Sequence, residues 1–311
     1  MKLLPAMLAV IVLGLSPKLL PAEDAPAKPS TAKPSTEKSS PDKLRLDNPF
    51  FAFDNSNGFR GVLPPAEQAK MLKKLGYAGV GYTGGKGIPA MLKAFDAKGL
   101  KINSIYVASR IGPNGPSYDQ NIKTAIEQLE GRDTVIWLSV GGKAVDVKDA
   151  QAQAVKVVRE IGKLAADAGL RVALYPHTGD YVETTEQALR VVKEVDLKNV
   201  GVSLNLCHRL KVDGEQNMRK TIEAAMPHLF LVSINGTDSG DTKAMGWDRL
   251  IQRLDRGDHD VYGFLKMLKQ LGYQGPIGLQ CYKVPGDAKE NLAGSMAAWK
   301  KLVARMAAEH K

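Results

Sequence analysis

One pattern recurs along most of this chain: a short apolar, β-branched run followed by an amphipathic segment. The clearest run is Val200–His208, VGVSLNLCH, which begins apolar and ends in an amide, a thiol and an imidazole. Strands of a parallel sheet covered on both faces have this composition, because neither face meets water. The predicted strands are Phe50–Asp54, Tyr77–Tyr82, Lys101–Val107, Thr134–Val140, Arg171–Tyr175, Asn199–Asn205, Leu229–Ile234 and Pro276–Cys281.

The segments between these runs carry apolar residues at helical spacing. Gly76 is a typical helix stop signal, and Thr184 with Gln187 resembles a capping box at a helix start. Asp287 with Glu290 resembles a second one. The predicted helices are Pro65–Leu75, Ile88–Lys98, Asn121–Leu129, Ala150–Ala168, Thr184–Val195, Gln216–Ala225, Val261–Leu271 and a final helix from Asp287 onward.

Eight strands alternating with eight helices predict a single (β/α)8 TIM barrel over residues 49–311. An open, doubly wound sheet is the alternative. It is disfavoured because neither GxGxxG nor GxxxxGK[ST] follows an early strand. In a barrel, polar groups at the C-terminal ends of the strands converge on one mouth, so we expect the functional site there.

The first 48 residues differ from the rest of the chain. Lys2 precedes an apolar run from Leu3 to Leu15, and small residues follow up to Ala22. This pattern predicts a signal peptide over residues 1–22 and a secreted or periplasmic protein without a membrane span after cleavage. An uncleaved membrane anchor is the alternative. Residues 23–48 are rich in Pro, Ala, Lys, Ser and Thr, which predicts a disordered linker.

The net charge of +10 permits an acidic partner. The chain lacks a Lys/Arg run and a basic stripe interleaved with aromatic residues, so we expect no nucleic-acid partner. Its oligomeric state is not predicted. The two cysteines, Cys207 and Cys281, fall at the ends of different predicted strands, and we do not expect a disulfide between them.

Several segments resemble the xylose isomerase-like TIM barrels, the sugar phosphate isomerase/epimerase superfamily. Leu254–Gln280 resembles the last third of that fold, Asn199–His208 resembles its sixth strand, and Leu174–His177 its fifth. The resemblance covers roughly residues 49–305. It implies a small-molecule carbohydrate as the ligand and a divalent metal ion at the barrel mouth.

The resemblance also implies where such a metal would bind. The family's ligands are a Glu, an Asp, a His and a Glu on strands five to eight, and they correspond to Tyr175, Asn205, Ser233 and Gln280. All four residues are neutral here, whereas a hard cation prefers anionic oxygens. We therefore predict no metal ligands and no cofactor. Mn, Mg or Zn would bind only if other residues compensate.

Two histidines remain as candidate catalytic residues at the predicted mouth, His177 and His208, because imidazole exchanges protons near neutral pH. Each could instead brace the barrel through hydrogen bonds. The candidate substrate-binding residues are Tyr175, Asn205, Gln280, Ser233, Lys143 and Asp54. Structural roles in packing or at the surface are their alternatives.

These residues favour one function and leave one alternative. The favoured function is a secreted isomerase-, epimerase- or lyase-like protein that acts on a sugar or keto-sugar by histidine-assisted proton transfer without a metal. The alternative is a sugar-binding barrel without catalysis. A nuclease is disfavoured, because the chain has only five histidines and no cluster of metal-binding side chains is predicted.

Overall fold

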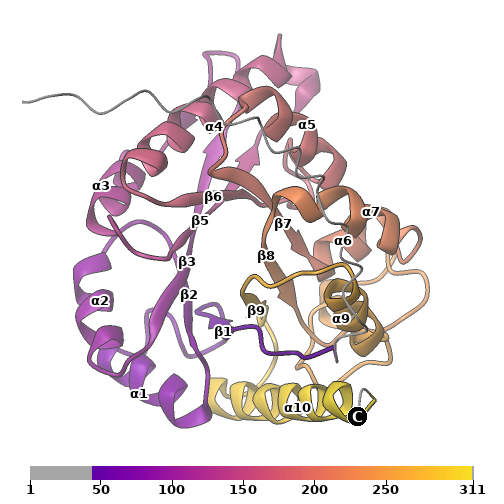
Figure 1. Ribbon diagram of the computed structural model, residues 1–311. Coiled ribbons are helices and arrows are strands. Elements are labelled where there is room, and N and C mark those ends of the chain that lie inside the picture. Colours follow the sequence, from indigo (N-terminus) through magenta and orange to yellow (C-terminus); the bar gives the residue numbers. More distant parts are fainter. Residues whose placement is uncertain (1–43, 310–311) are drawn as a thin grey trace, which may run out of the picture. The chain divides into compact units, whose positions relative to one another are not determined.

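The computed structural model describes residues 44–309, which form a closed barrel of eight parallel strands (Figure 1). The strands are β1 (Phe50–Phe53), β2 (Gly79–Thr83), β3 (Lys101–Arg110), β5 (Val135–Gly141), β6 (Arg171–Leu174), β7 (Val200–Asn205), β8 (Leu229–Ile234) and β9 (Ile277–Leu279). β1 pairs with β2 on one side and with β9 on the other, so the sheet has no free edge within the ring. The predicted (β/α)8 barrel is confirmed.

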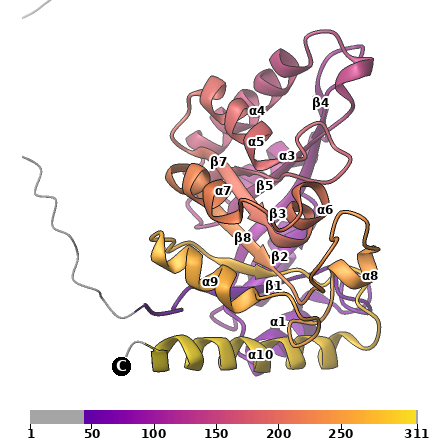
Figure 2. The same ribbon diagram turned by 90° about the vertical axis from the view of Figure 1, so that its right-hand side faces the viewer.

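Eight helices alternate with these strands and surround them (Figures 1 and 2). They are α1 (Pro65–Leu75), α2 (Ile88–Asp96), α3 (Asn121–Gln128), α4 (Ala150–Asp167), α5 (Thr185–Val195), α7 (Met218–Ala225), α9 (Val261–Gln270) and α10 (Ala288–Glu309). Helix α1 ends at Gly76, whose φ of 95° is left-handed. Thr184 and Gln187 form both bonds of the predicted capping box at α5. None of the helices in the described residues is long and apolar enough to cross a membrane.

Five short elements of the described residues were not predicted. Four of them lie on the C-terminal side of the strands, and the fifth, a 3-10 turn at Met226–His228, precedes β8. Helix α6 (Leu206–Asp213) begins directly after β7, and α8 (Trp247–Leu250) lies within the predicted long loop after β8. β4 (Ser117–Tyr118) pairs antiparallel with the end of β3, which is therefore longer than predicted. A 3-10 turn, Ala144–Asp146, follows β5.

The barrel interior is filled with large side chains. The inner cluster consists of Phe51, Phe53, Val135, Trp137, Ala173, Tyr175 and Leu231. Glycines on neighbouring strands make room for the rings: a Cβ at Gly81 would lie 2.3 Å from Phe53 Cδ1, and one at Gly278 would lie 2.6 Å from Phe53 Cε2. The interior is a packed core, and its upper layer forms the floor of the mouth.

The last residues of the predicted linker contact the barrel. Leu46 is buried, and the Asn48 amide donates a 2.7 Å hydrogen bond to the Gly275 carbonyl. The Lys269 ammonium lies 3.2 Å from Asp47 Oδ1. Residues 44–48 are thus part of the folded unit, which begins at least five residues before the boundary at residue 49 that composition indicated. The rest of the linker and the predicted signal peptide lie outside the described residues.

Candidate functional site

A cavity of about 400 Å³ opens at the C-terminal end of the barrel, where the sequence placed the site. Every strand of the ring, or the loop that follows it, contributes to its wall, as in other TIM-barrel sites. The lining residues are Phe53, Asn55, Arg60, Thr83, Tyr106, Trp137, Tyr175, His177, Thr178, His208, Trp247, Ile251, Gln280 and Tyr282. We call this space the mouth cavity.

Stacked aromatic rings form the floor of the mouth cavity. The Trp137 ring lies parallel to Tyr175, with centroids 3.8 Å apart, and to Phe53, with centroids 4.5 Å apart. The Trp137 indole donates a 2.7 Å hydrogen bond to Ser203 Oγ, which holds the ring in place. Tyr106 meets both Trp137 and Tyr175 edge-on. Because its two stacked neighbours cover the faces of Trp137, the floor is an apolar, rigid base of packed rings beneath the cavity.

The two histidines meet above this floor, with ring centroids 4.2 Å apart. His208 lies in the first turn of α6. Its Nδ1 accepts a 3.2 Å hydrogen bond from the backbone N–H of Thr178 and lies 3.0 Å from Thr178 Oγ1. Burial, and secondly the neighbouring His177, hold the pKa of His208 well below its usual range. His208 is therefore neutral near pH 7, and because Nδ1 accepts, its proton is on Nε2.

His177 has a different environment. It follows β6, and its Nδ1 lies 3.8 Å from Asp180 Oδ2. Burial raises the pKa of the Asp180 carboxyl, while His177 and a hydrogen bond with Ser139 oppose that rise. At 3.8 Å the contact between His177 and Asp180 is electrostatic, and the buried Nδ1 has no hydrogen-bond partner among the described atoms. The two histidines thus have different environments: His208 Nδ1 accepts hydrogen bonds from Thr178, whereas His177 Nδ1 faces a carboxylate.

The positions that correspond to the family's metal ligands form a neutral cluster. The Asn205 amide donates a 3.1 Å hydrogen bond to the Tyr175 hydroxyl and its oxygen accepts one from the Cys207 thiol at 3.0 Å. Gln280 Oε1 accepts hydrogen bonds from the Asn55 amide and from the Tyr282 N–H. Burial raises the pKa of Tyr175 well above its usual range, so its phenol stays protonated.

This donor set does not fit a hard divalent cation. Its oxygens are uncharged, and two of its side chains already bond to each other. Ser233 is buried in β8 with its hydroxyl unpartnered among the described atoms. In residues 44–309 no three His, Cys, Asp or Glu side chains cluster in a way that could hold a metal ion. We therefore assign no step to a metal.

The predicted substrate-binding residues are divided among different places. Tyr175 and Gln280 line the mouth cavity, and Asn205 lies directly behind Tyr175. Asp54 is buried outside the cavity lining, where it accepts a 3.0 Å bond from the Thr83 N–H, and burial raises its pKa. Its position fits the structural alternative. Lys143 lines a neighbouring cavity. The thiols of Cys207 and Cys281 are free and buried.

The lining residues that sequence reasoning missed include Arg60, Trp137, Thr178 and Trp247. Trp137 was read as one more apolar residue of a strand, although its alternation with Val135 could have indicated an inward ring. Arg60 lies in a turn after β1 and Trp247 begins the short helix α8, and no local pattern predicts where either segment runs. The ring centroid of Trp247 is 5.1 Å from that of His208.

Known proteins resemble this chain in fold and, more weakly, in sequence. The 3-dehydroshikimate dehydratase of Pseudomonas aeruginosa is 28% identical over 162 residues, 51% of this chain but only 25% of that enzyme. The chain thus spans about a quarter of that relative. The apo structure of the E. coli 3-keto-D-glucoside 4-epimerase is 17% identical, with a TM-score of 0.64 over 82% of this chain and 99% of the other.

A third relative is IOLI, whose structure contains a bound zinc atom. It is 17% identical, with a TM-score of 0.62 over 84% of this chain and 99% of the other. Identities this low show a common fold and nothing finer. The profile of the family described as xylose isomerase-like TIM barrel, however, matches residues 69–302, most of the chain. The chain therefore belongs to the xylose isomerase-like TIM barrel family.

Proposed function

We propose that this protein acts on a sugar or keto-sugar by proton transfer next to the carbonyl, with His177 and His208 in place of the family's carboxylates and metal. The observation that carries the proposal is the pair of imidazoles in different environments, with centroids 4.2 Å apart, above an aromatic floor. The similarity to a 3-keto-D-glucoside epimerase and to a dehydratase supports the substrate class.

The proposal assigns one tautomer to each histidine. His177 carries its proton on Nδ1, on the side of Asp180, and His208 carries its proton on Nε2. His177 Nε2 removes the proton from the carbon adjacent to the carbonyl, and the C–H electron pair forms the enolate. The Nε2–H of His208 donates a hydrogen bond to the carbonyl oxygen, where negative charge develops. A neutral imidazole can serve in this way, because its N–H becomes a stronger partner as the oxygen becomes anionic.

The enolate has two outcomes. If His177 delivers the proton to the neighbouring carbon of an enediol, the product is an isomer, and if another acid protonates the opposite face of the original carbon, the product is an epimer. If a substituent on the next carbon leaves with its electron pair, the product is an unsaturated carbonyl compound and the reaction is a lyase reaction. The enzyme would use the same two histidines in both cases, so the first proton transfer is the step to measure.

Deuterium exchange provides the test. The protein, treated with EDTA, is incubated with a 3-keto-D-glucoside in D₂O, and NMR follows loss of the proton adjacent to the ketone. We expect exchange by the native protein, and a rate lowered roughly 100-fold or more in His177→Ala and in His208→Ala. His228→Ala is the matched control, because His228 precedes β8 at the opposite end of the barrel.

The alternative function, sugar binding without catalysis, predicts a different result. The ligand would then change the fluorescence of Trp137 without catalysed exchange. Exchange that is unchanged in both histidine variants would contradict the proposed roles of His177 and His208. Exchange that disappears with EDTA and returns with added Mn²⁺ would contradict the metal-free mechanism.

A further inference from the structure

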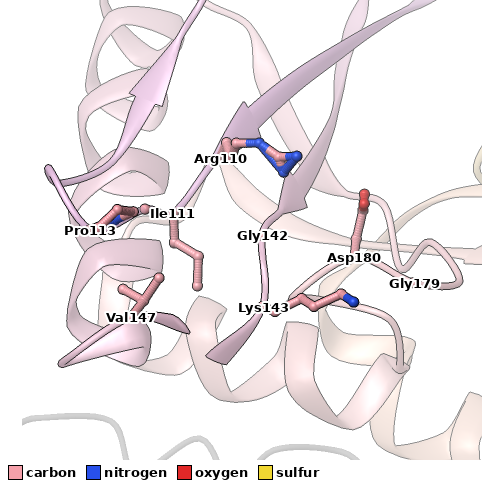
Figure 3. A pocket seen from close by; sticks show the side chains of 9 residues that line it. Arg110, Ile111, Pro113, Gly142, Lys143, Val147, Gly179 and Asp180 are labelled. Atoms are coloured by element: carbon pink, nitrogen blue, oxygen red, sulfur yellow. The ribbon is translucent and has the colours of Figure 1, made fainter. Parts of the chain in front are cut away.

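Two more cavities adjoin the mouth cavity on the side of His177. The nearer one, of about 390 Å³, shares Tyr106 and His177 with the mouth cavity. It shares Arg110 and Asp180 with the farther one, of about 420 Å³ (Figure 3). The three spaces form a series that leads from the two histidines past the ends of β3 and β5.

The farther cavity has an excess of positive charge. Arg110, Lys143 and Asp180 are the charged residues in its lining, so two cations face one carboxylate (Figure 3). Arg110 is the last residue of β3, and Lys143 follows β5; both are exposed. The Asp180 carboxylate also faces His177. A negatively charged group would be attracted to this cavity.

The nearer cavity, which lies between the mouth cavity and the farther one, does not add an excess of negative charge. Its additional acid, Asp119, accepts a 2.9 Å hydrogen bond from the Asn121 backbone N–H beside the start of α3, and this bond lowers its pKa. Arg110 lines this cavity as well. A Cβ at Gly141 would lie 3.5 Å from Asp180 Oδ1 and 3.7 Å from Arg110 Nη1, so both groups flank the same stretch of backbone.

Glycine backbone forms much of the remaining wall of the farther cavity. Gly142 has a φ of +101°, and a Cβ there would lie 2.6 Å from the Ile111 carbonyl oxygen. A side chain at this position would therefore strain the backbone and collide with Ile111, the residue that follows β3. Gly112 and Gly179 also line this cavity, together with the apolar side chains of Ile111, Pro113 and Val147. A ligand can approach the backbone closely between the Arg110 and Lys143 side chains.

We propose that the Arg110–Lys143 cavity binds an anionic group of the substrate, a carboxylate or a phosphate or sulfate ester, while the carbonyl end lies in the mouth cavity beside His177 and His208. The inference rests on the proposed function and names its substrate class: an acidic sugar derivative. The guanidinium of Arg110 provides a planar pair of donors for such an oxyanion, and Lys143 adds a second charge.

Binding of matched sugars tests this inference. Affinities for D-glucose, D-glucuronate, D-glucose 6-phosphate and D-glucose 6-sulfate are measured by calorimetry at low and high salt. We expect at least one acidic sugar to bind about tenfold more tightly than glucose at low salt, because a hydrogen bond to a charged group is stronger than one to a neutral group. The preferred acid distinguishes a carboxylate from an ester. The preference should weaken at high salt.

Variants assign the preference to the cavity. We expect Arg110→Gln with Lys143→Gln to remove the preference and leave glucose binding unchanged. Lys148→Gln, at an exposed position of the same loop, should retain it. Equal affinities for glucose and all three acids in the native protein, or a preference unchanged in the double variant, would overturn the inference. Deuterium exchange on a neutral keto-sugar would then still support the proposed function.

Discussion

Single residues decide what chemistry the mouth of this barrel can perform. Tyr175, Asn205 and Gln280 occupy positions where the family resemblance places anionic ligands, and here they form a neutral hydrogen-bonded layer. Burying carboxylates together is costly unless a cation or protons neutralise them. The amide and phenol groups avoid that cost, and the layer can therefore pack against Trp137 as part of the floor.

Restoring the charges should restore a dependence on metal. We expect Asn205→Asp with Gln280→Glu to bind Mn²⁺ more tightly than the native protein, because two carboxylates then face one site. Without metal, the double variant should be less stable at pH 7 and recover as the pH falls and the carboxyls become protonated. Titration calorimetry and thermal unfolding measure both effects. About one equivalent of Mn, Mg or Zn at the native mouth in elemental analysis would contradict our reading of this layer.

The buried His208 should make stability depend on pH. Its pKa in the folded state lies below the unfolded value of 6.5, so the unfolded chain binds the proton more readily. The contribution of neutral His208 to the free energy of unfolding is complete above pH 6.5. It is lost as the pH falls below that value, by up to about 1.4 kcal/mol per pH unit. Between pH 7 and 5 the free energy of unfolding should fall more in the native protein than in His208→Gln. Parallel curves for the two proteins would contradict this assignment.

At the scale of elements, the loops after the strands explain most differences from prediction. The run VGVSLNLCH was read as a strand with a reactive end, but its last residues begin α6 and bury Leu206 and Cys207. Strand β3 extends to Arg110 because its end pairs with β4. Neither change follows from local periodicity, since each depends on a partner segment that only the folded chain supplies.

The segment before β1 provides the test at this scale. A chain that begins at residue 49 should unfold at a lower temperature than one that begins at residue 44. The loss of buried Leu46 and of the Asn48 hydrogen bond should cost about 2 kcal/mol. Asp47→Asn in the longer chain is the control and should change little, because its ion pair with Lys269 is mostly exposed on the Asp side. Equal melting temperatures for the two chains would return residues 44–48 to the linker.

At the scale of the whole molecule, the closed ring brings residues from eight separate segments to one mouth. The histidines are 31 positions apart in the sequence, yet their rings meet because β6 and β7 are neighbours in the sheet.

We also propose export of the protein through its first 22 residues. The intact mass of protein recovered from the periplasm or medium should lack that segment, and a full-length mass would favour the membrane anchor.

The sequence by itself determined the fold class and the location of the site. Buried parallel strands must be apolar along their length, so eight such runs with helices between them are visible without a structure. His177 and His208 were found for the same reason, since polar groups directly after such runs reach the mouth.

Only the tertiary structure decided the tautomer of His208, the aromatic floor and the extended cavity. Burial, and secondly His177, lower the pKa of His208, and the Thr178 N–H bonds to its Nδ1. Trp137 belongs to the floor because its ring points into the barrel and stacks on Tyr175. Lys143 lines a cavity next to the predicted site, together with Arg110, because the ends of β3 and β5 lie side by side in the sheet. Each of these depends on contacts between segments distant in sequence, which local patterns do not contain.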